Sequence, residues 1–171
     1  MIADDISKKL PATKNQSLFS SREYRKALGR FATGVSVVTT EHAGRIHGMT
    51  ANAFVSVSLD PPLVLLSVDN RSHMHQILPA TLRYGVSVLA EGQESLSNHF
   101  AGRSTDEVEI KFTTRENMPL LEGAVAYFVV DVADIHPAGD HTLYIGRVTH
   151  FDCFECKPLL FYAGQYEKIH T

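Results

Sequence analysis

The stretch VSVVTTEHAGRIHGMTANAFVSVSLDPPLVLLSV, residues 35–68, indicates the fold more clearly than the rest of the chain. It is rich in β-branched residues and in short alternations of apolar and polar side chains, which are typical of strands. Pro61 and Pro62 lack a backbone donor and should interrupt strand pairing. The apolar run 63–68 predicts a strand buried on both faces. We therefore predict a turn at 42–44 and strands over 35–40, 45–53, 55–58 and 63–68.

The flanking sequence adds helices to this β-rich stretch. Ser20 and Glu23 have the spacing of a capping box, and the apolar residues after them recur at helical spacing, which predicts a helix of about three turns. Residues 102–118 are charged and irregular, and they predict an exposed excursion. Residues 159–166 predict a last strand or loop. We also predict helices over 72–78 and 93–100, a turn at 137–139, and strands over 84–89, 123–135 and 141–151.

Many strands joined by short turns, with helices inserted between some of them, predict a mainly β fold. The arrangement favours an antiparallel barrel over alternating βαβ units, and a barrel removes exposed sheet edges. Residues 1–18 show little periodicity and predict a loose N-terminal arm, while 19–171 are expected to form a single domain.

Composition excludes several classes of function. The chain has 171 residues, of which 44% are hydrophobic and 20% charged, so a folded protein is expected. A formal net charge of -3 gives no electrostatic footprint for nucleic acid or an anionic membrane. No apolar run reaches the roughly 20 residues that cross a bilayer, and the polar N-terminus lacks a secretory signal. We expect a cytoplasmic protein in which Cys153 and Cys156 form no structural disulfide.

Standard catalytic motifs are missing from the sequence. It contains no phosphate-binding loop, no Rossmann glycine fingerprint and no Gly-x-Ser-x-Gly elbow. His150, Cys153 and Cys156 offer three metal ligands, but a structural zinc site needs four, so ordinary strand residues are the favoured interpretation. A structural barrel that binds zinc through these three residues stays open as an alternative.

Three ordered sequence blocks resemble the flavin reductase-like domain family. The first is TGVSVVTT, residues 33–40, followed by GMTANAFVSVSLDPPLV, residues 48–64. The second is GDHTLYIGRV, residues 139–148, and the third is PLLFYAGQY, residues 158–166. The resemblance implies a six-stranded, Greek-key-like split β-barrel that forms a homodimer and binds flavin at or near the subunit interface.

The resemblance also implies the residues that bind each cofactor. His141 matches the position at which nicotinamide stacks on the flavin, and we expect it to act there. Gly164, Gln165 and Tyr166 are weaker candidates for shaping the dinucleotide pocket. For the flavin phosphate, Ser72 is the first candidate and Arg71 the second, because Ser72 is well placed to cap a helix whose N-terminus offers free backbone donors. The implied flavin contacts are Met49, Thr50, Ala51, Asn52, Ser56, Ser67, Val68, Arg71, Ser72, His73, Phe100 and Ala101.

The function implied is an NAD(P)H-dependent flavin reductase. It would reduce FMN or FAD by hydride transfer and supply reduced flavin to a partner monooxygenase, with NADH or NADPH as donor. The alternative from another class is a flavin-binding carrier or sensor module without reductase turnover. The sequence does not indicate which of the two flavins or which of the two nicotinamide donors is preferred.

Overall fold

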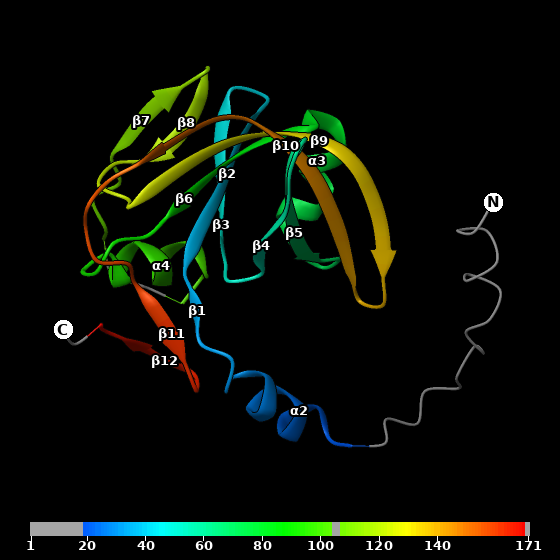
Figure 1. The fold of residues 1–171 in the computed structure, drawn as a ribbon, viewed down its shortest axis with the longest axis vertical. Helices are drawn as coiled ribbons and strands as arrows, with labels where there is room; N and C mark the ends of the chain where they lie inside the picture. The colour runs from blue at the N-terminus through cyan, green and yellow to red at the C-terminus, as the bar shows by residue number, and fades with distance from the viewer. Residues whose placement is uncertain (1–18, 104–106, 170–171) are drawn as a thin grey trace, which may run out of the picture.

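A seven-stranded antiparallel sheet is the main element of the fold (Figure 1). The computed structural model describes residues 19–103 and 107–169, so the predicted arm at 1–18 lies outside the described residues. The strand order confirms the prediction of a mainly β, antiparallel fold. In order across the sheet the strands are β3 (Arg45–Ala51), β2 (Ser36–His42), β6 (Arg83–Val88), β9 (Ala126–Ala138), β10 (His141–Cys153), β5 (Pro62–Asp69) and β4 (Phe54–Leu59).

The sheet curls because its two edge strands follow one another in the chain. In a flat sheet, six inter-strand spacings would place β3 and β4 roughly 28 Å apart. However, β3 ends at Ala51 and β4 begins at Phe54, and three residues span at most about 10 Å. The two edges must therefore approach each other at this end, although no pairing between β3 and β4 is seen among the described residues.

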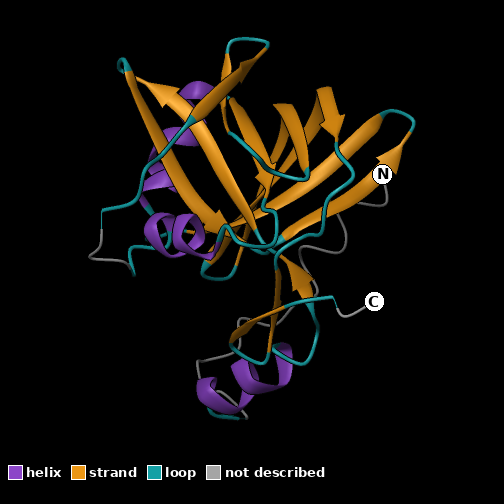
Figure 2. Ribbon diagram, turned by 90° about the vertical axis from the view of Figure 1, so that its left-hand side faces the viewer, coloured by secondary structure: helices purple, strands orange, loops and turns teal. Residues whose placement is uncertain are grey.

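Two small sheets and three helices complete the described part of the chain. One small sheet and α2 project from the main sheet as a separate lobe (Figure 2). Within the described residues, no helix is long and apolar enough to span a bilayer. The remaining elements are β1 (Thr33–Gly34), β11 (Leu160–Tyr162), β12 (Gln165–Glu167), β7 (Phe112–Arg115), β8 (Met118–Leu121), α2 (Ser21–Leu28), α3 (His73–Thr81) and α4 (Glu94–Phe100).

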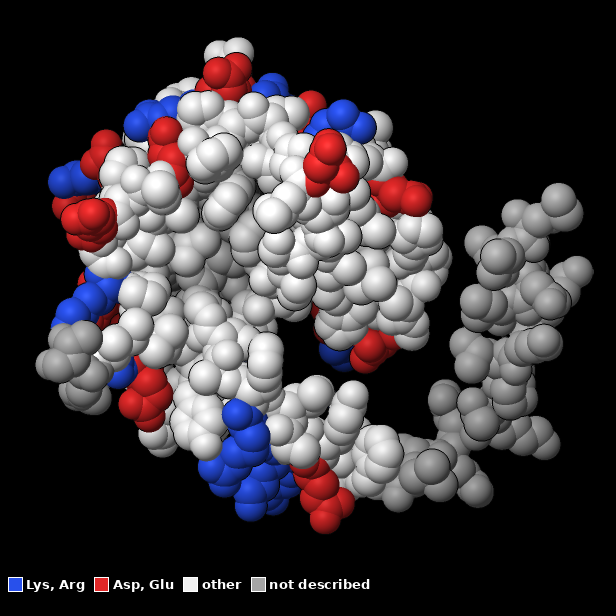
Figure 3. Space-filling model, in the orientation of Figure 1, with Lys and Arg blue, Asp and Glu red and all other residues white. Residues whose placement is uncertain are grey.

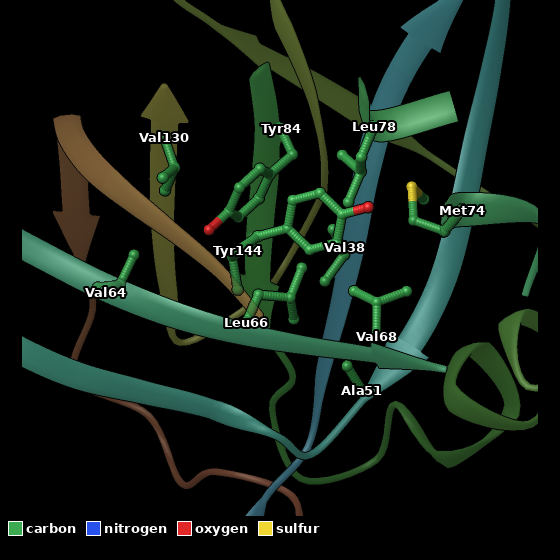
Figure 4. Packing of buried hydrophobic residues seen from close by; sticks show 11 residues of the cluster. Val38, Ala51, Val64, Leu66, Val68, Met74, Leu78, Tyr84, Val130 and Tyr144 are labelled. Atoms are coloured by element: carbon green, nitrogen blue, oxygen red, sulfur yellow. The ribbon is translucent and has the colours of Figure 1, made fainter. Parts of the chain in front are cut away.

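The main core fills the concave side of the curled sheet (Figure 4). Tyr84 and Tyr144 are completely buried there, and α3 adds Met74 and Leu78. Along β5, alternate residues are buried and the residues between them are half-buried. The prediction of a strand buried on both faces is therefore wrong for the single chain, because only one face of β5 packs on this core.

Two of the predicted helix starts are confirmed by their caps. The Ser20 hydroxyl accepts a hydrogen bond from the Glu23 N–H at 3.2 Å, and the Glu23 carboxylate accepts in return from the Ser20 N–H at 3.4 Å, as a capping box requires. The Ser72 hydroxyl accepts from the His75 N–H at 3.2 Å, which places the start of α3 where the sequence predicts it. However, α2 buries none of its residues.

The predicted irregular excursion at 102–118 is wrong in its second half. Residues 112–121 form the β7–β8 hairpin, whose turn places Glu116 and Asn117 at φ of 48° and 60°. Asn tolerates this left-handed region, which permits a two-residue turn. Leu120 and Leu121 are then fully buried.

Other predicted boundaries shift by a few residues. The pairing break expected at the two prolines falls at residues 60–61, since Pro62 already pairs with Leu59. The turn expected at 137–139 is wrong by two residues, because β9 continues to Ala138 and the turn is formed by Gly139 and Asp140. The C-terminal piece forms the β11–β12 hairpin.

Close packing at Gly146 predicts a stability difference between two glycine substitutions. A Cβ at residue 146 would overlap Val130 and lie 3.2 Å from the Asp131 carbonyl oxygen, which belongs to a paired strand. A Cβ at Gly34 would meet nothing within 4 Å. Because overpacking costs about 1–3 kcal/mol, we expect Gly146→Ala to lower the free energy of unfolding by this amount in urea denaturation. Equal stabilities of Gly146→Ala and the control Gly34→Ala would contradict this account.

Candidate functional site

A surface cavity of about 190 Å³ lies where the end of β3 meets α4 and the β11–β12 hairpin. Its walls come from segments far apart in the sequence, so only the fold brings them together. Five of the lining residues are predicted flavin or dinucleotide contacts: Thr50, Ala51, Asn52, Ala101 and Tyr166. The sequence predicts no contact for the other four: Val35, Ser97, Arg103 and Phe161.

Hydrogen bonds fix α4 against β3 and β12 around this cavity. The Thr50 hydroxyl donates to the Ser97 carbonyl at 2.7 Å. The Tyr166 hydroxyl lies 2.8 Å from the Ser97 hydroxyl and 2.9 Å from the Asn98 side-chain oxygen. These polar groups therefore hold the cavity wall in place, with Ser97 buried at the centre of the network.

Phe100 also positions α4. Its ring lies against Gly48 on β3, where a Cβ would overlap the ring, so the missing side chain at residue 48 permits the close approach. Phe100 also packs on the buried cluster that includes Val35 and Leu159. Met49 packs instead against the main core, so its side chain is occupied with packing there.

A second recess of about 340 Å³ adjoins the cavity. The two share Val35 and Asn52, and the recess also contains Ser56, another predicted flavin contact. Thr33 lines the recess too, and its hydroxyl oxygen is buried without a hydrogen-bond partner. Such an atom is costly unless a further group satisfies it.

The predicted phosphate region lies beside the end of β3. Val68 is fully buried in the same core cluster as Ala51 and Met74, so its side chain belongs to the core (Figure 4). The rings of His73 and His47 lie 5.2 Å apart, which joins the start of α3 to β3. Ser67 is half-buried, and its N–H donates to the Ala53 carbonyl at 3.1 Å.

Arg71 is bound to a neighbouring carboxylate. Its Nη2 lies 2.7 Å from Asp69 Oδ2 and its Nε lies 3.1 Å from Asp69 Oδ1. The hydrogen bonds from Arg71 hold the pKa of the Asp69 carboxyl well below its usual range. The positive charge of Arg71 is therefore already balanced.

His141 begins β10 and stands opposite Asp69 on β5. Its Nδ1 lies 2.7 Å from Asp140 Oδ1, and this contact lowers the pKa of the Asp140 carboxyl. The side chain is 40% exposed and does not line the cavity. The structure thus places His141 beside the predicted phosphate region, at the tip of the β9–β10 hairpin (Figure 1).

The C-terminal candidates separate into two groups. Gly164 forms the β11–β12 turn at φ of 87°, and Gln165 is exposed, so of the three only Tyr166 lines the cavity. Three of the four missed residues carried a signal. Val35 and Phe161 lie inside the sequence blocks quoted above, and Ser97 is one helical turn before Ala101. Arg103 carried no such signal.

The metal alternative gains no support from the geometry. Cys153 and Cys156 are both exposed free thiols. His150 Nε2 lies 3.5 Å from Asp152 Oδ1. Among the described residues, no three histidine, cysteine or acidic side chains are grouped so that they could hold a metal ion.

Comparisons with known proteins agree with one another. The flavin reductase like domain matches residues 28–170. An NADH-dependent flavin reductase from Rhodococcus sp is 49% identical over 148 residues, which cover 85% of this chain and 84% of the relative. The structure of the flavin reductase PheA2 superposes with a TM-score of 0.88 at 42% identity, covering 90% of this chain and all of the other. The styrene monooxygenase flavin reductase from Pseudomonas putida S12 superposes with a TM-score of 0.80 at 40% identity, covering 86% of this chain and 97% of the other.

Proposed function

Because the chain belongs to the flavin reductase like domain family, we propose that it transfers hydride from NADH or NADPH to FMN or FAD. We propose further that the reduced flavin is supplied to a partner monooxygenase, as the name of the styrene monooxygenase flavin reductase indicates for that protein. The observation that carries the proposal is the cavity itself, which gathers five of the predicted contact residues from separate elements.

The residues present suit a flavin. An isoalloxazine ring needs polar contacts along one edge and apolar surface against its faces. Thr50 and Asn52 provide polar groups at the end of β3, and Phe161 and Tyr166 provide aromatic surface. Asn52 also reaches the adjoining recess, where Ser56 and the unpaired Thr33 hydroxyl can serve ribityl hydroxyls.

The phosphate group is assigned to the start of α3. The first backbone N–H groups of a helix lack partners inside the helix and attract anions. Ser72 caps one of them, which leaves others for a ligand, and His73 stands next in the chain. Since Arg71 is held by Asp69, we assign it a smaller part in phosphate binding than Ser72 and His73.

When bound, the flavin accepts at N5 the hydride that leaves C4 of the reduced nicotinamide. The protein orients the two rings and limits the access of water between them. We assign this positioning to residues 50–52 and Tyr166 on the flavin side. His141 is assigned to the nicotinamide, with Asp140 fixing the orientation of its imidazole ring. A carrier or sensor module without turnover is the alternative, but the relative from Rhodococcus sp is named as a reductase.

The family also suggests the fold and the oligomeric state. We interpret the curled sheet, open between β3 and β4, as a split barrel within a single domain over 19–171. We propose a homodimer, because α2 exposes Tyr24 and Leu28 and buries nothing in the single chain. Figure 3 shows a hollow between α2 and the main body that a second copy could fill. The two exposed thiols fit a reducing, cytoplasmic location.

Flavin-dependent turnover is the direct test of the function. Purified protein is mixed with NADH or NADPH together with FMN, FAD or no flavin, and nicotinamide oxidation is followed at about 340 nm, where the reduced ring absorbs. We expect oxidation that requires added flavin, together with a preference within each pair of cofactors. A folded protein that binds flavin but shows no turnover with any combination would support the carrier or sensor module instead.

Replacing His141 should weaken the use of the nicotinamide and leave flavin binding intact. Loss of one hydrogen bond to bound substrate predicts a fall of about 10- to 100-fold in kcat/KM for the nicotinamide in His141→Ala. His136→Ala is the matched control, because His136 is also exposed and also pairs with a neighbouring aspartate, at 2.9 Å. Flavin affinity is measured by fluorescence quenching. Equal effects of the two substitutions would refute the assignment of His141.

Dimerisation should depend on the exposed face of α2. We expect the wild-type protein to elute as a dimer in size-exclusion chromatography with light scattering. The double variant Tyr24→Asp, Leu28→Asp should shift it toward the monomer, since charges in an apolar contact are unfavourable. Leu82→Asp is the control, because Leu82 is exposed elsewhere and aspartate tolerates its positive φ of 51°. A monomeric wild-type protein would exclude the proposed interface.

A further inference from the structure

We propose that Arg103 supplies the positive charge that stabilises the reduced, anionic flavin in the cavity, an inference that rests on the proposed function. Arg103 lies at one wall of the cavity, together with Thr50, Asn52 and Tyr166. No motif in the sequence singles it out.

The local backbone directs Arg103 toward the cavity. Residues 101–103 leave the end of α4, and their N–H groups donate to carbonyls of the last helical turn, with Arg103 N–H bonded to Asn98 at 2.9 Å. Gly102 adopts a φ of 66°, a left-handed conformation that glycine accepts without strain. The chain therefore turns sharply at residue 102, and Arg103 lines the cavity together with Ala101 and Ser97.

Arg103 is the one charged residue among those that line the cavity in the described part of the chain. The neutral hydroxyls nearby are already engaged, since Thr50 bonds the Ser97 carbonyl and Tyr166 bonds the Ser97 and Asn98 side chains. The other candidate cation, Arg71, is held by Asp69 at 2.7 Å. No ion pair or side-chain hydrogen bond of Arg103 is found within the described residues.

Hydride transfer creates the charge that Arg103 would balance. The C4–H bond of the nicotinamide breaks and an N5–H bond forms, so the nicotinamide is oxidised by two electrons and the flavin is reduced by two. Because the hydrogen arrives with both electrons, the flavin ring gains one negative charge before any proton is taken up. The C-terminal end of α4 carries the partial negative charge of the helix dipole, which would disfavour that product. The guanidinium of Arg103 would offset both the charge gained by the flavin and the partial charge at the end of α4.

Flavin affinity in each oxidation state tests the proposal. Arg103→Gln keeps the length and polarity of the side chain and removes its charge, and Arg103→Lys retains the charge. Dissociation constants are measured anaerobically for oxidised and for chemically reduced FMN, by fluorescence quenching or calorimetry. We expect Arg103→Gln to weaken the binding of reduced FMN about tenfold and to change the dissociation constant of oxidised FMN less than about twofold. A tenfold difference lowers the two-electron potential of the bound flavin by about 30 mV. Arg103→Lys should stay close to wild type.

Two controls separate this role from others. Arg147→Gln removes an exposed arginine of β10 that lines neither the cavity nor the recess, and it should change neither affinity. Riboflavin, which lacks the phosphate, should show the same selective loss for its reduced form.

Three results would overturn the proposal. Equal weakening of oxidised and reduced FMN, with riboflavin unaffected, would make Arg103 a phosphate contact. If Arg103→Gln leaves both flavin affinities unchanged but lowers the thermal stability, Arg103 serves only to stabilise the end of α4. Failure of the wild-type protein to bind either form of flavin would overturn the proposed function and this inference with it.

Discussion

The two-residue connection between β3 and β4 is the constraint on which the rest of the structure depends. It ties the opposite edges of a seven-stranded sheet together, so the sheet has to curl and enclose one core. It also leaves Asn52 outside the strand ladder, at the point where the edges diverge. Asn52 lines both the cavity and the recess, so the candidate site lies at the end of the sheet where the two edges are tied together.

The groups that hold the cavity wall together also line the candidate site. Ser97 is buried, and its carbonyl and hydroxyl hold Thr50 and Tyr166 in place. These groups are therefore fixed before any ligand arrives, which gives the site a preorganised shape at little reorganisation cost. As a consequence, few neutral hydrogen-bond donors in the wall remain free to stabilise a negative charge that the ligand gains on reduction.

The strands could be predicted from the sequence because alternation and β-branched residues are local signals. The β7–β8 hairpin could not, because its turn uses Glu116 and Asn117 rather than a glycine pair, and its four-residue first strand directly follows the charged stretch 106–111. Family resemblance supplied Thr50, Asn52 and Tyr166. It did not supply Arg103, since that residue reaches the cavity only through the end of α4 and the left-handed Gly102. Such placement depends on tertiary packing, which has no local signature.

Arg71 and Arg103 illustrate why residue type alone does not identify a ligand contact. Both are exposed arginines near predicted flavin positions, but Arg71 has a carboxylate two residues away and its charge is already balanced. Arg103 faces neutral groups, so a negative charge in the cavity is its available counterion. Its exposure lets solvent screen that attraction, which keeps the stabilisation of a reduced ligand modest. Modest stabilisation suits a protein that has to release its reduced product, whereas a deeply buried cation would retain it.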